Sequence, residues 1–171
     1  MYEGHGVLFH ENGTVMYEGD FNKNKMQSPL TEITIKHDND KVEYEGFINN
    51  GLYEGYGKLY KRNGKLWRTG NFTEGKQNGK NCVIYYPNGL MHYQGEMKMG
   101  RVYGFGRYYC SKSGKLKSYG EHNFGLFKSS KLRIGLHPNG QIKHFGSFNS
   151  ANELIKSNRF EFYKDGCYVN H

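Results

Sequence analysis

The chain has 171 residues, of which 36% are apolar and 16% are aromatic, and its formal net charge is +8. No apolar run approaches the roughly 20 residues of a membrane-spanning helix, and the aromatic content is too high for a typical disordered chain. Three widely spaced cysteines do not favour a disulfide framework, and residues 1–5 lack the pattern of a secretion signal, so a cytoplasmic location is expected.

A short motif, consisting of a turn, a strand and a later glycine, recurs along the whole chain. In the first copy Asn12 and Gly13 form the turn, and Gly19 lies six residues after Gly13. The seven copies have their turn position at Gly13, Asp40, Gly64, Gly89, Gly114, Gly140 and Gly166. The later glycine is six residues away in all six complete copies, whereas the period varies from 24 to 27 residues. The hairpin is therefore the fixed unit, and the connection between hairpins varies.

Each copy of the motif predicts one antiparallel β-hairpin, so the chain is expected to be all-β. Asn-Gly pairs favour positive φ and tight turns. After each turn apolar and polar residues alternate, as at Val15, Tyr17, Gly19 and Phe21, which is typical of a strand with one covered face. The hairpins are expected around residues 6–21, 32–48, 57–72, 81–97, 106–122, 132–148 and 159–171 of a single array that spans residues 1–171. A longer surface loop is expected at residues 22–31, before the degraded second copy.

The glycine inside each second strand is unusual, because glycine weakens a strand unless its missing side chain is needed. Large residues flank it, as Tyr17 and Phe21 flank Gly19. We expect the glycine to leave room for an aromatic ring of the same or the next hairpin; a simple β-bulge is the alternative. A second pattern, Gly-x-Gly, precedes alternate hairpins. It begins at Gly4, Gly55 and Gly104, which are 51 and 49 residues apart, and it indicates a superperiod of two hairpins.

Four segments carry a resemblance to a known repeat family. They are Tyr17–Phe21 (YEGDF), Tyr44–Phe47 (YEGF), Tyr53–Gly57 (YEGYG) and Tyr85–Gly89 (YYPNG). In register these segments resemble MORN repeats, and the fifth and sixth copies, which lack Tyr-Glu-Gly, look like variant MORN repeats. The resemblance covers residues 2–148 and extends weakly to Tyr168. It implies an elongated, twisted, single-layer antiparallel sheet of about seven consecutive hairpins.

The resemblance also implies a function, because MORN arrays commonly bind partner proteins along an aromatic-lined groove. It implies a non-enzymatic protein–protein interaction scaffold, a subunit of a multi-protein complex associated with the cytoskeleton, a cilium or a membrane. A curved sheet with aromatic side chains on one face suits a partner helix or extended segment. The expected partner-binding face consists of Tyr17, Phe21, Tyr44, Tyr93 and Met97. Packing between neighbouring hairpins is the alternative role for these side chains.

The positive charge is confined to one part of the chain. Residues 98–171 hold 13 Lys and Arg against 4 Asp and Glu, whereas residues 1–97 hold 11 against 12. An acidic partner or an anionic phospholipid surface is therefore the alternative binding function. The expected contacts are Arg101, Arg107, Lys115, Lys117, Lys131 and Arg133. A basic, solvated face without a dedicated ligand is the other interpretation.

The sequence predicts no catalytic residues, no metal site and no cofactor. The paired glycines fit neither dinucleotide-binding nor phosphate-loop spacing, and the eight histidines are scattered. A carbohydrate- or choline-binding hairpin array relies on tryptophan-rich cages, and Trp67 is the one tryptophan. Tyrosines in the basic part could stack on bases, but the chain has no nucleic-acid-binding motif, so nucleic acid is not favoured.

Overall fold

The computed structural model describes residues 1–123, 126–127, 132–137, 139, 141–147, 160–162 and 168–170. Within these residues the chain forms strands and no helix. The strands are β1 (Gly4–Phe9), β2 (Val15–Asn22), β3 (Lys25–Lys36), β4 (Val42–Asn49), β5 (Leu52–Tyr60), β6 (Leu66–Thr73), β7 (Lys76–Gln77), β8 (Gly79–Tyr85), β9 (Met91–Lys98), β10 (Arg101–Tyr109), β11 (Leu116–Asn123), β12 (Leu126–Phe127), β13 (Leu132–Leu136), β14 (Ile142–Ser147), β15 (Phe160–Phe162) and β16 (Tyr168–Asn170).

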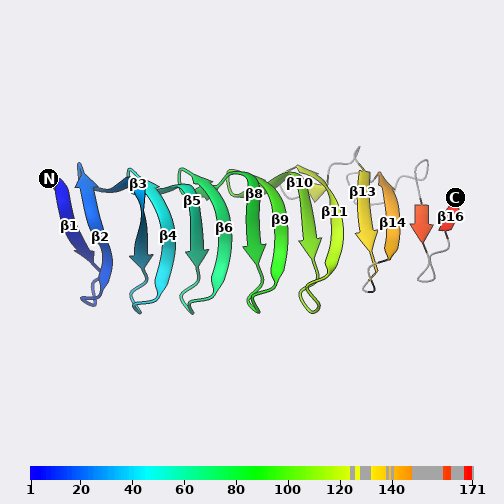
Figure 1. Ribbon diagram of the computed structural model, residues 1–171, viewed down its shortest axis with the longest axis horizontal. Helices are drawn as coiled ribbons and strands as arrows, with labels where there is room; N and C mark the ends of the chain where they lie inside the picture. Colours follow the sequence, from blue (N-terminus) through cyan, green and yellow to red (C-terminus); the bar gives the residue numbers. More distant parts are fainter. Residues whose placement is uncertain are drawn as a thin grey trace.

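All these strands belong to one open antiparallel sheet. Strands that follow each other in the chain are neighbours in the sheet, and only the short strands β7 and β12 lie off this path. The hairpins stand in a single row with β1 at one end and β16 at the other (Figure 1). The predicted fold class, an all-β, elongated and twisted single-layer sheet of about seven hairpins, is confirmed.

Three connections between hairpins, from β2 to β3, from β4 to β5 and from β9 to β10, are tight two-residue turns. Two consecutive residues with positive φ join β4 to β5 (Asn50 and Gly51) and β9 to β10 (Met99 and Gly100). Such pairs make the two-residue turns that match the twist of antiparallel strands. Lys23 and Asn24 form the same connection before β3, so the surface loop expected at residues 22–31 is wrong. The left-handed backbone that Lys23 and Asn24 adopt lets the strand resume at once.

A β-bulge recurs in the first six hairpins. In the first, Leu8 pairs with Tyr17 but its neighbour Phe9 pairs with Val15, which leaves Met16 as an extra residue. The same register shift occurs in the next five hairpins. Adjacent residues of a strand point to opposite faces, so Val15 and Tyr17 lie on opposite faces of the sheet. Alternate spacing in the sequence predicts one shared face, and the extra residue is the reason that the structure differs.

We call the side of the sheet that carries Tyr17, Tyr44 and Tyr93 the tyrosine face. The buried apolar side chains lie here in two clusters. The first contains Tyr17, Ile35, Tyr44, Ile48 and Phe72, and the second contains Cys82, Tyr93 and Met97. A single-layer sheet therefore builds its core from contacts between successive hairpins rather than against a second layer.

Candidate functional site

The residues predicted to bind a partner lie together on the tyrosine face. Tyr17, Tyr44, Tyr93 and Met97 are each 2% exposed or less, and Phe21 is half-buried. The chain itself covers four of the five side chains. Their burial agrees with the alternative role given above, packing between neighbouring hairpins.

The tyrosine hydroxyls are tied to the backbone of their own strands. Tyr44 donates to the carbonyl of Phe47 at 2.9 Å, and Tyr93 donates to the carbonyl of Glu96 at 2.9 Å. Burial raises the pKa of both phenols well above the ordinary value. The rings are therefore neutral, fixed structural elements at any physiological pH.

The Tyr44 ring lies over two glycines, one on its own strand and one on the next hairpin. A Cβ atom at Gly46 on β4 or at Gly57 on β5 would approach the Tyr44 hydroxyl to less than 3.0 Å. The glycines therefore make space for the ring, as the flanking large residues predict. The register shift between β4 and β5 also begins at Gly46, so this glycine both makes room for an aromatic ring and lies at a β-bulge.

Two hairpins further along, Tyr93 repeats this arrangement. It lies over Gly95 on β9 and Gly106 on β10, and a Cβ atom at either position would come closer than 3.0 Å to its hydroxyl. Gly57 and Gly106 are the last residues of the Gly-x-Gly pattern. The second and third copies of the Gly-x-Gly pattern thus have a physical reason: each places a glycine beneath the tyrosine of the hairpin before it, Tyr44 or Tyr93.

The third hairpin interrupts the row of tyrosines with a polar cluster. Arg68 occupies the tyrosine position, donates to Gln77 at 3.0 Å, and lies 4.5 Å from the Trp67 ring. Gln77 is buried, and its amide donates to the carbonyls of Thr69 and Val83. Burial lowers the pKa of Arg68. Sequence reasoning missed this cluster, although Arg68 at a repeat position held by tyrosine in three other hairpins was a usable signal.

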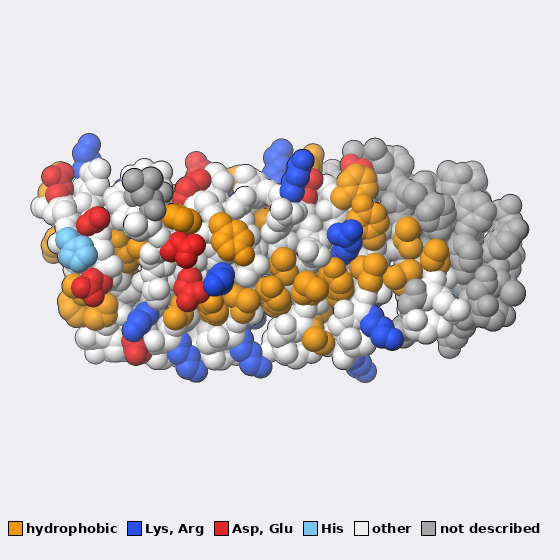
Figure 2. All heavy atoms as spheres, in the orientation of Figure 1, with side chains coloured by type: hydrophobic (Ala, Val, Ile, Leu, Met, Phe, Trp, Pro, Cys, Tyr) orange, Lys and Arg blue, Asp and Glu red, His pale blue; other side chains and the backbone are white. Residues whose placement is uncertain are grey.

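A row of hydrophobic side chains runs along the long axis of the sheet on the face seen in Figure 2, with charged side chains above and below it. The bulges place a row of apolar side chains on the side of the sheet opposite the tyrosine face, where the first strand of each hairpin ends and its second strand begins. We call these exposed or half-buried side chains the apolar row. They are Phe9, Val15, Val42, Tyr60, Leu66, Tyr85, Met91, Tyr109, Leu116, Leu136 and Ile142.

Hydrogen bonds hold two rings of the apolar row to the preceding hairpin. Tyr60 donates to the carboxylate of Glu45 at 2.7 Å, and Tyr109 donates to the side-chain carbonyl of Gln94 at 3.0 Å. Burial and the Glu45 carboxylate raise the pKa of Tyr60 to about 12. These contacts fix the orientation of the two rings, which are half-buried.

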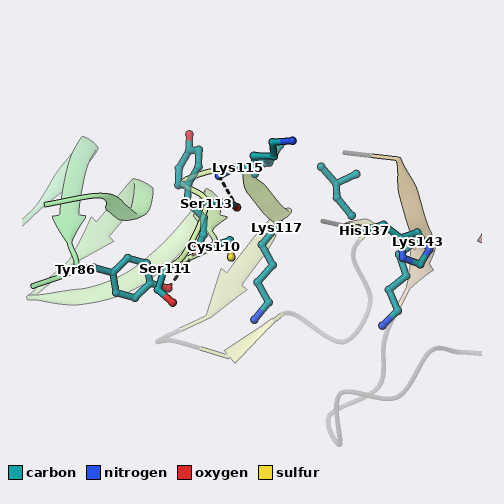
Figure 3. A pocket seen from close by; sticks show the side chains of 11 residues that line it. Tyr86, Cys110, Ser111, Ser113, Lys115, Lys117, His137 and Lys143 are labelled. Carbon is teal, nitrogen blue, oxygen red and sulfur yellow. Dashed lines mark hydrogen bonds between the residues drawn. The ribbon is translucent and has the colours of Figure 1, made fainter. Parts of the chain in front are cut away.

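A cavity of about 330 Å³ lies at the hairpin tips in the basic part of the chain. Lys115 and Lys117 line it together with His137 and Lys143, which come from the next hairpin. The side chains of Lys117 and Lys143 extend in the same direction from β11 and β14 (Figure 3). Lysines at equivalent positions of successive hairpins thus bring positive charge to one hollow.

Cys110 also lines this cavity. Hydrogen bonds from the Ser113 hydroxyl and from the backbone of Ser113 and Lys112 lower the pKa of its thiol to about 7, with the charge of Lys117 contributing. Cys82 differs, because burial raises its pKa. Cys82 and Cys110 are free thiols whose pKa values are shifted in opposite directions.

The other basic residues predicted to contact an acidic partner lie elsewhere. Arg107 is exposed on β10 with its guanidinium 5.3 Å from the Tyr119 ring, and Arg101 is exposed at the start of the same strand. Lys131 lies outside the described residues, as does the side chain of Arg133. Lys115 and Lys117 are therefore the two predicted contacts that the structure brings to one cavity.

The described residues contain no group of three or more His, Cys, Asp or Glu side chains that could hold a metal ion. Nor does any helix in that part of the chain have the length and apolar character to cross a membrane. No protein-family model and no curated protein sequence matches the chain.

Proposed function

We propose that this chain is a non-enzymatic protein–protein interaction scaffold of the MORN-repeat type, a docking subunit of a larger assembly. The observation that carries the proposal is the single layer: one open sheet leaves its faces without a covering layer over the described hairpins. A scaffold uses such a surface, because an extended face can bury a helix or an extended segment of a partner along its length. The cytoskeletal, ciliary or membrane-associated setting implied by the resemblance belongs to the same proposal.

The apolar row is the surface that we assign to the partner. Its rings are accessible in the isolated chain, whereas the tyrosines of the opposite face are buried. Rings already held by hydrogen bonds, such as Tyr60 and Tyr109, lose little conformational freedom on binding. The two faces of the sheet have different roles. The tyrosine face fixes the spacing of the hairpins, and the apolar row presents side chains to the partner at that spacing.

The test is affinity purification of the chain from the cells that express it, with identification of the proteins that co-purify. Two exposed methionines give a matched pair of variants: Met91 belongs to the apolar row and is 36% exposed, and Met99 lies in the connection after β9 and is 43% exposed. We expect Met91→Ser, combined with Tyr85→Ser, to lose the partner and Met99→Ser to keep it. Recovery of the wild-type chain as a free monomer would remove the proposal.

Binding to anionic phospholipid is the second candidate, and the cavity lined by lysines favours it. Lys115, Lys117 and Lys143 place positive charge at one hollow of the hairpin tips, where phosphate groups would be attracted. Sedimentation with anionic and neutral liposomes at low and high salt tests this function. Lys117→Ala with Lys143→Ala should abolish binding, whereas Lys58→Ala, in the other half of the chain, should not. Absence of binding to anionic liposomes at low salt would end this alternative.

A further inference from the structure

The turn of the fifth hairpin differs from the turns of the first four. In the fourth hairpin the N–H of Gly89 donates to the carbonyl of Tyr86, three residues earlier, at 2.9 Å, and the first three turns have the same spacing. In the fifth hairpin the N–H of Gly114 donates to the carbonyl of Cys110, four residues earlier, at 2.8 Å. This turn therefore contains one extra residue. Ser113 also replaces the asparagine that stands at this position in the first four hairpins.

The asparagine that Ser113 replaces connects neighbouring turns. In three of the first four hairpins its side-chain amide donates to a backbone carbonyl in the following turn. These hydrogen bonds extend from Asn12 to Asp38, from Asn39 to Arg62 and from Asn88 to Ser111, and they are 2.6–2.8 Å long. A serine side chain is shorter and has no amide group. The repeat thus changes at the fifth turn, and the cavity of about 330 Å³ is lined by residues of this turn and of the sixth hairpin.

Basic side chains near the earlier turns have partners within the chain. The contacts join Lys36 to Asp40 at 2.7 Å, Arg62 to Asp38 at 2.5 Å, and Lys65 to the carbonyl of Pro87 at 2.7 Å. The side chains of Lys117 and Lys143, in contrast, make no ion pair or hydrogen bond within the described residues. Their positive charge is therefore available to an anion from outside the chain.

The cavity collects positive charge and hydroxyl groups. Lys117 and Lys143 line it from successive hairpins, and their side chains extend in the same direction (Figure 3). Ser111 and Ser113 also line it, and their hydroxyl groups can donate hydrogen bonds. No aspartate or glutamate is among the described residues of its lining. A hollow with one sign of charge concentrates counter-ions, so this cavity favours an anionic group.

The apolar row forms part of the cavity wall. Tyr109, Leu116 and Leu136 belong to the row and line the cavity. A partner segment that docks along the row therefore passes beside the lysines, and a short side chain is enough to carry an anionic group from its backbone into the cavity. The cavity is continuous with the surface assigned above to the partner.

We propose that the cavity binds a phosphorylated serine or threonine of the partner segment that docks along the apolar row. Lys117 and Lys143 would pair with the phosphate, and the hydroxyl groups of Ser111 and Ser113 would donate to its oxygens. A phosphate monoester carries about −1.5 to −2 charges at pH 7 and has three acceptor oxygens, so it matches two lysines better than a single carboxylate does. Phosphorylation of the partner then controls its docking. This inference rests on the proposed scaffold function and names the chemistry of its partner.

The test measures how strongly three libraries of short peptides are retained by the full chain at about 0.15 M salt. The central residue is phosphoserine, glutamate or serine, and the residues around it vary at random. We expect the phosphoserine library to be retained about tenfold more strongly than the other two, because charge-assisted hydrogen bonds to a phosphate are the stronger ones. Equal retention of the three libraries, or retention of none, would overturn the proposal.

Two protein variants locate the site. Lys117→Ala with Lys143→Ala should reduce the retention of phosphoserine peptides to that of serine peptides. Lys112→Ala is the matched control, because Lys112 is exposed in the same turn and is not among the described residues that line the cavity. It should keep the preference for phosphoserine. A full preference in the double variant, or its loss in Lys112→Ala, would place the phosphate outside the cavity and overturn the proposal.

Cys110 reports whether the cavity is occupied, because it belongs to the lining. Bound phosphopeptide should slow the alkylation of Cys110 by iodoacetamide about fivefold or more, since a nearby negative charge disfavours the thiolate. Inorganic phosphate and phosphatidylserine vesicles, at the same phosphate concentration, should protect Cys110 less, because neither docks on the apolar row. Equal or stronger protection by vesicles would assign the cavity to a membrane, and the same result with inorganic phosphate would leave a simple anion site. Either result would overturn the proposal.

A failure of this inference differs from a failure of the scaffold function. If the wild-type chain co-purifies with a partner that phosphatase treatment does not release, the phosphate site is wrong and the scaffold function stands. A wild-type chain that co-purifies with no protein removes the scaffold function instead.

Discussion

The contact between Tyr44 and Gly57 allows a quantitative test of how the array is held together. Replacing Gly57 by alanine adds one methyl group, which would approach the Tyr44 ring and hydroxyl to less than 3.0 Å. Gly57 does not have a left-handed backbone, so the cost is steric and not conformational. Overpacking a well-packed core typically costs about 1–3 kcal/mol, and we expect Gly57→Ala to destabilise the chain by that amount.

The ring supplies the other half of the calculation. Tyr44 is fully buried, stacks on Tyr53 and donates one hydrogen bond, so Tyr44→Ala should cost about 3–5 kcal/mol. Once the ring is gone, Gly57→Ala should be neutral, or stabilising by about 0.4–1 kcal/mol, because alanine restricts the unfolded chain. The double variant should therefore be more stable than the sum of the single effects predicts, by about 1.5 kcal/mol or more.

Urea unfolding followed by the fluorescence of Trp67, which lies on the adjacent strand β6, measures these free energies. Hydrogen exchange of residues 44–60 shows whether the loss is local, since a repeat array can open in parts. Gly6→Ala is the matched control, because Gly6 holds the equivalent position and a Cβ atom there would meet the Phe21 ring at 3.4 Å, so the change in stability should be less than about 0.5 kcal/mol. The reasoning is refuted if Gly57→Ala is harmless in the wild type, or equally harmful when Tyr44 is alanine.

Three further outcomes are expected at the remaining sites. Alkylation of Cys110 should reach half its maximal rate near pH 7, whereas the buried Cys82 should stay unreacted in the folded chain. Peptide mapping by mass spectrometry measures the alkylation of each cysteine. A half-maximal rate for Cys110 near about pH 8.5 would contradict this prediction. Burial, with a smaller effect from the charge of Lys117, lowers the pKa of His92 below the ordinary value of 6.5. As the pH drops below 6.5, His92 is therefore protonated first in the unfolded chain, and the folded chain loses stability. Urea midpoints at about pH 5 and pH 7 should show a smaller decrease for His92→Gln, and an equal decrease would exclude this origin. Gln77→Leu should cost about 1–3 kcal/mol in thermal or urea unfolding, because Arg68 and two carbonyls lose a partner, and Gln77→Glu should cost less because it can still accept from Arg68.

The hairpins could be predicted because their signals are local. Asn12-Gly13 specifies a turn through its own backbone preferences, and Gly13 adopts the left-handed conformation that this requires, with φ of 82°. The space above the in-strand glycines was also predictable, since large residues flank a residue that has no other reason to occur in a strand. Local chemistry and repetition together were enough for the fold class.

The assignment of faces could not be predicted, because the bulge residue has no characteristic identity. Met16 is an extra residue in the first hairpin, and residues as different as Glu43 and Trp67 hold the same position in the next two. No alternation rule detects an insertion of this kind, yet it moves Val15 to the face opposite Tyr17. The gathering of lysines at the hairpin tips could have been predicted, because Lys117 and Lys143 occupy equivalent positions of successive copies of the motif.

The bulge also explains how one repetitive sheet can present different chemistry along its length. The tyrosines and the glycines beneath them fix the spacing of the hairpins, and few substitutions fit there because the rings are buried. The bulge position also lies on the tyrosine face, but no glycine contact or buried ring restricts which residue can occupy it. It holds Met16, Glu43, Trp67, His92, Lys117 and Lys143. Along the sheet these side chains therefore change from apolar and acidic at Met16 and Glu43, through aromatic at Trp67, to basic at Lys117 and Lys143. In this architecture the positions that pack the hairpins together differ from the positions whose residue type varies, so the side-chain chemistry can change along the sheet while the packing stays the same.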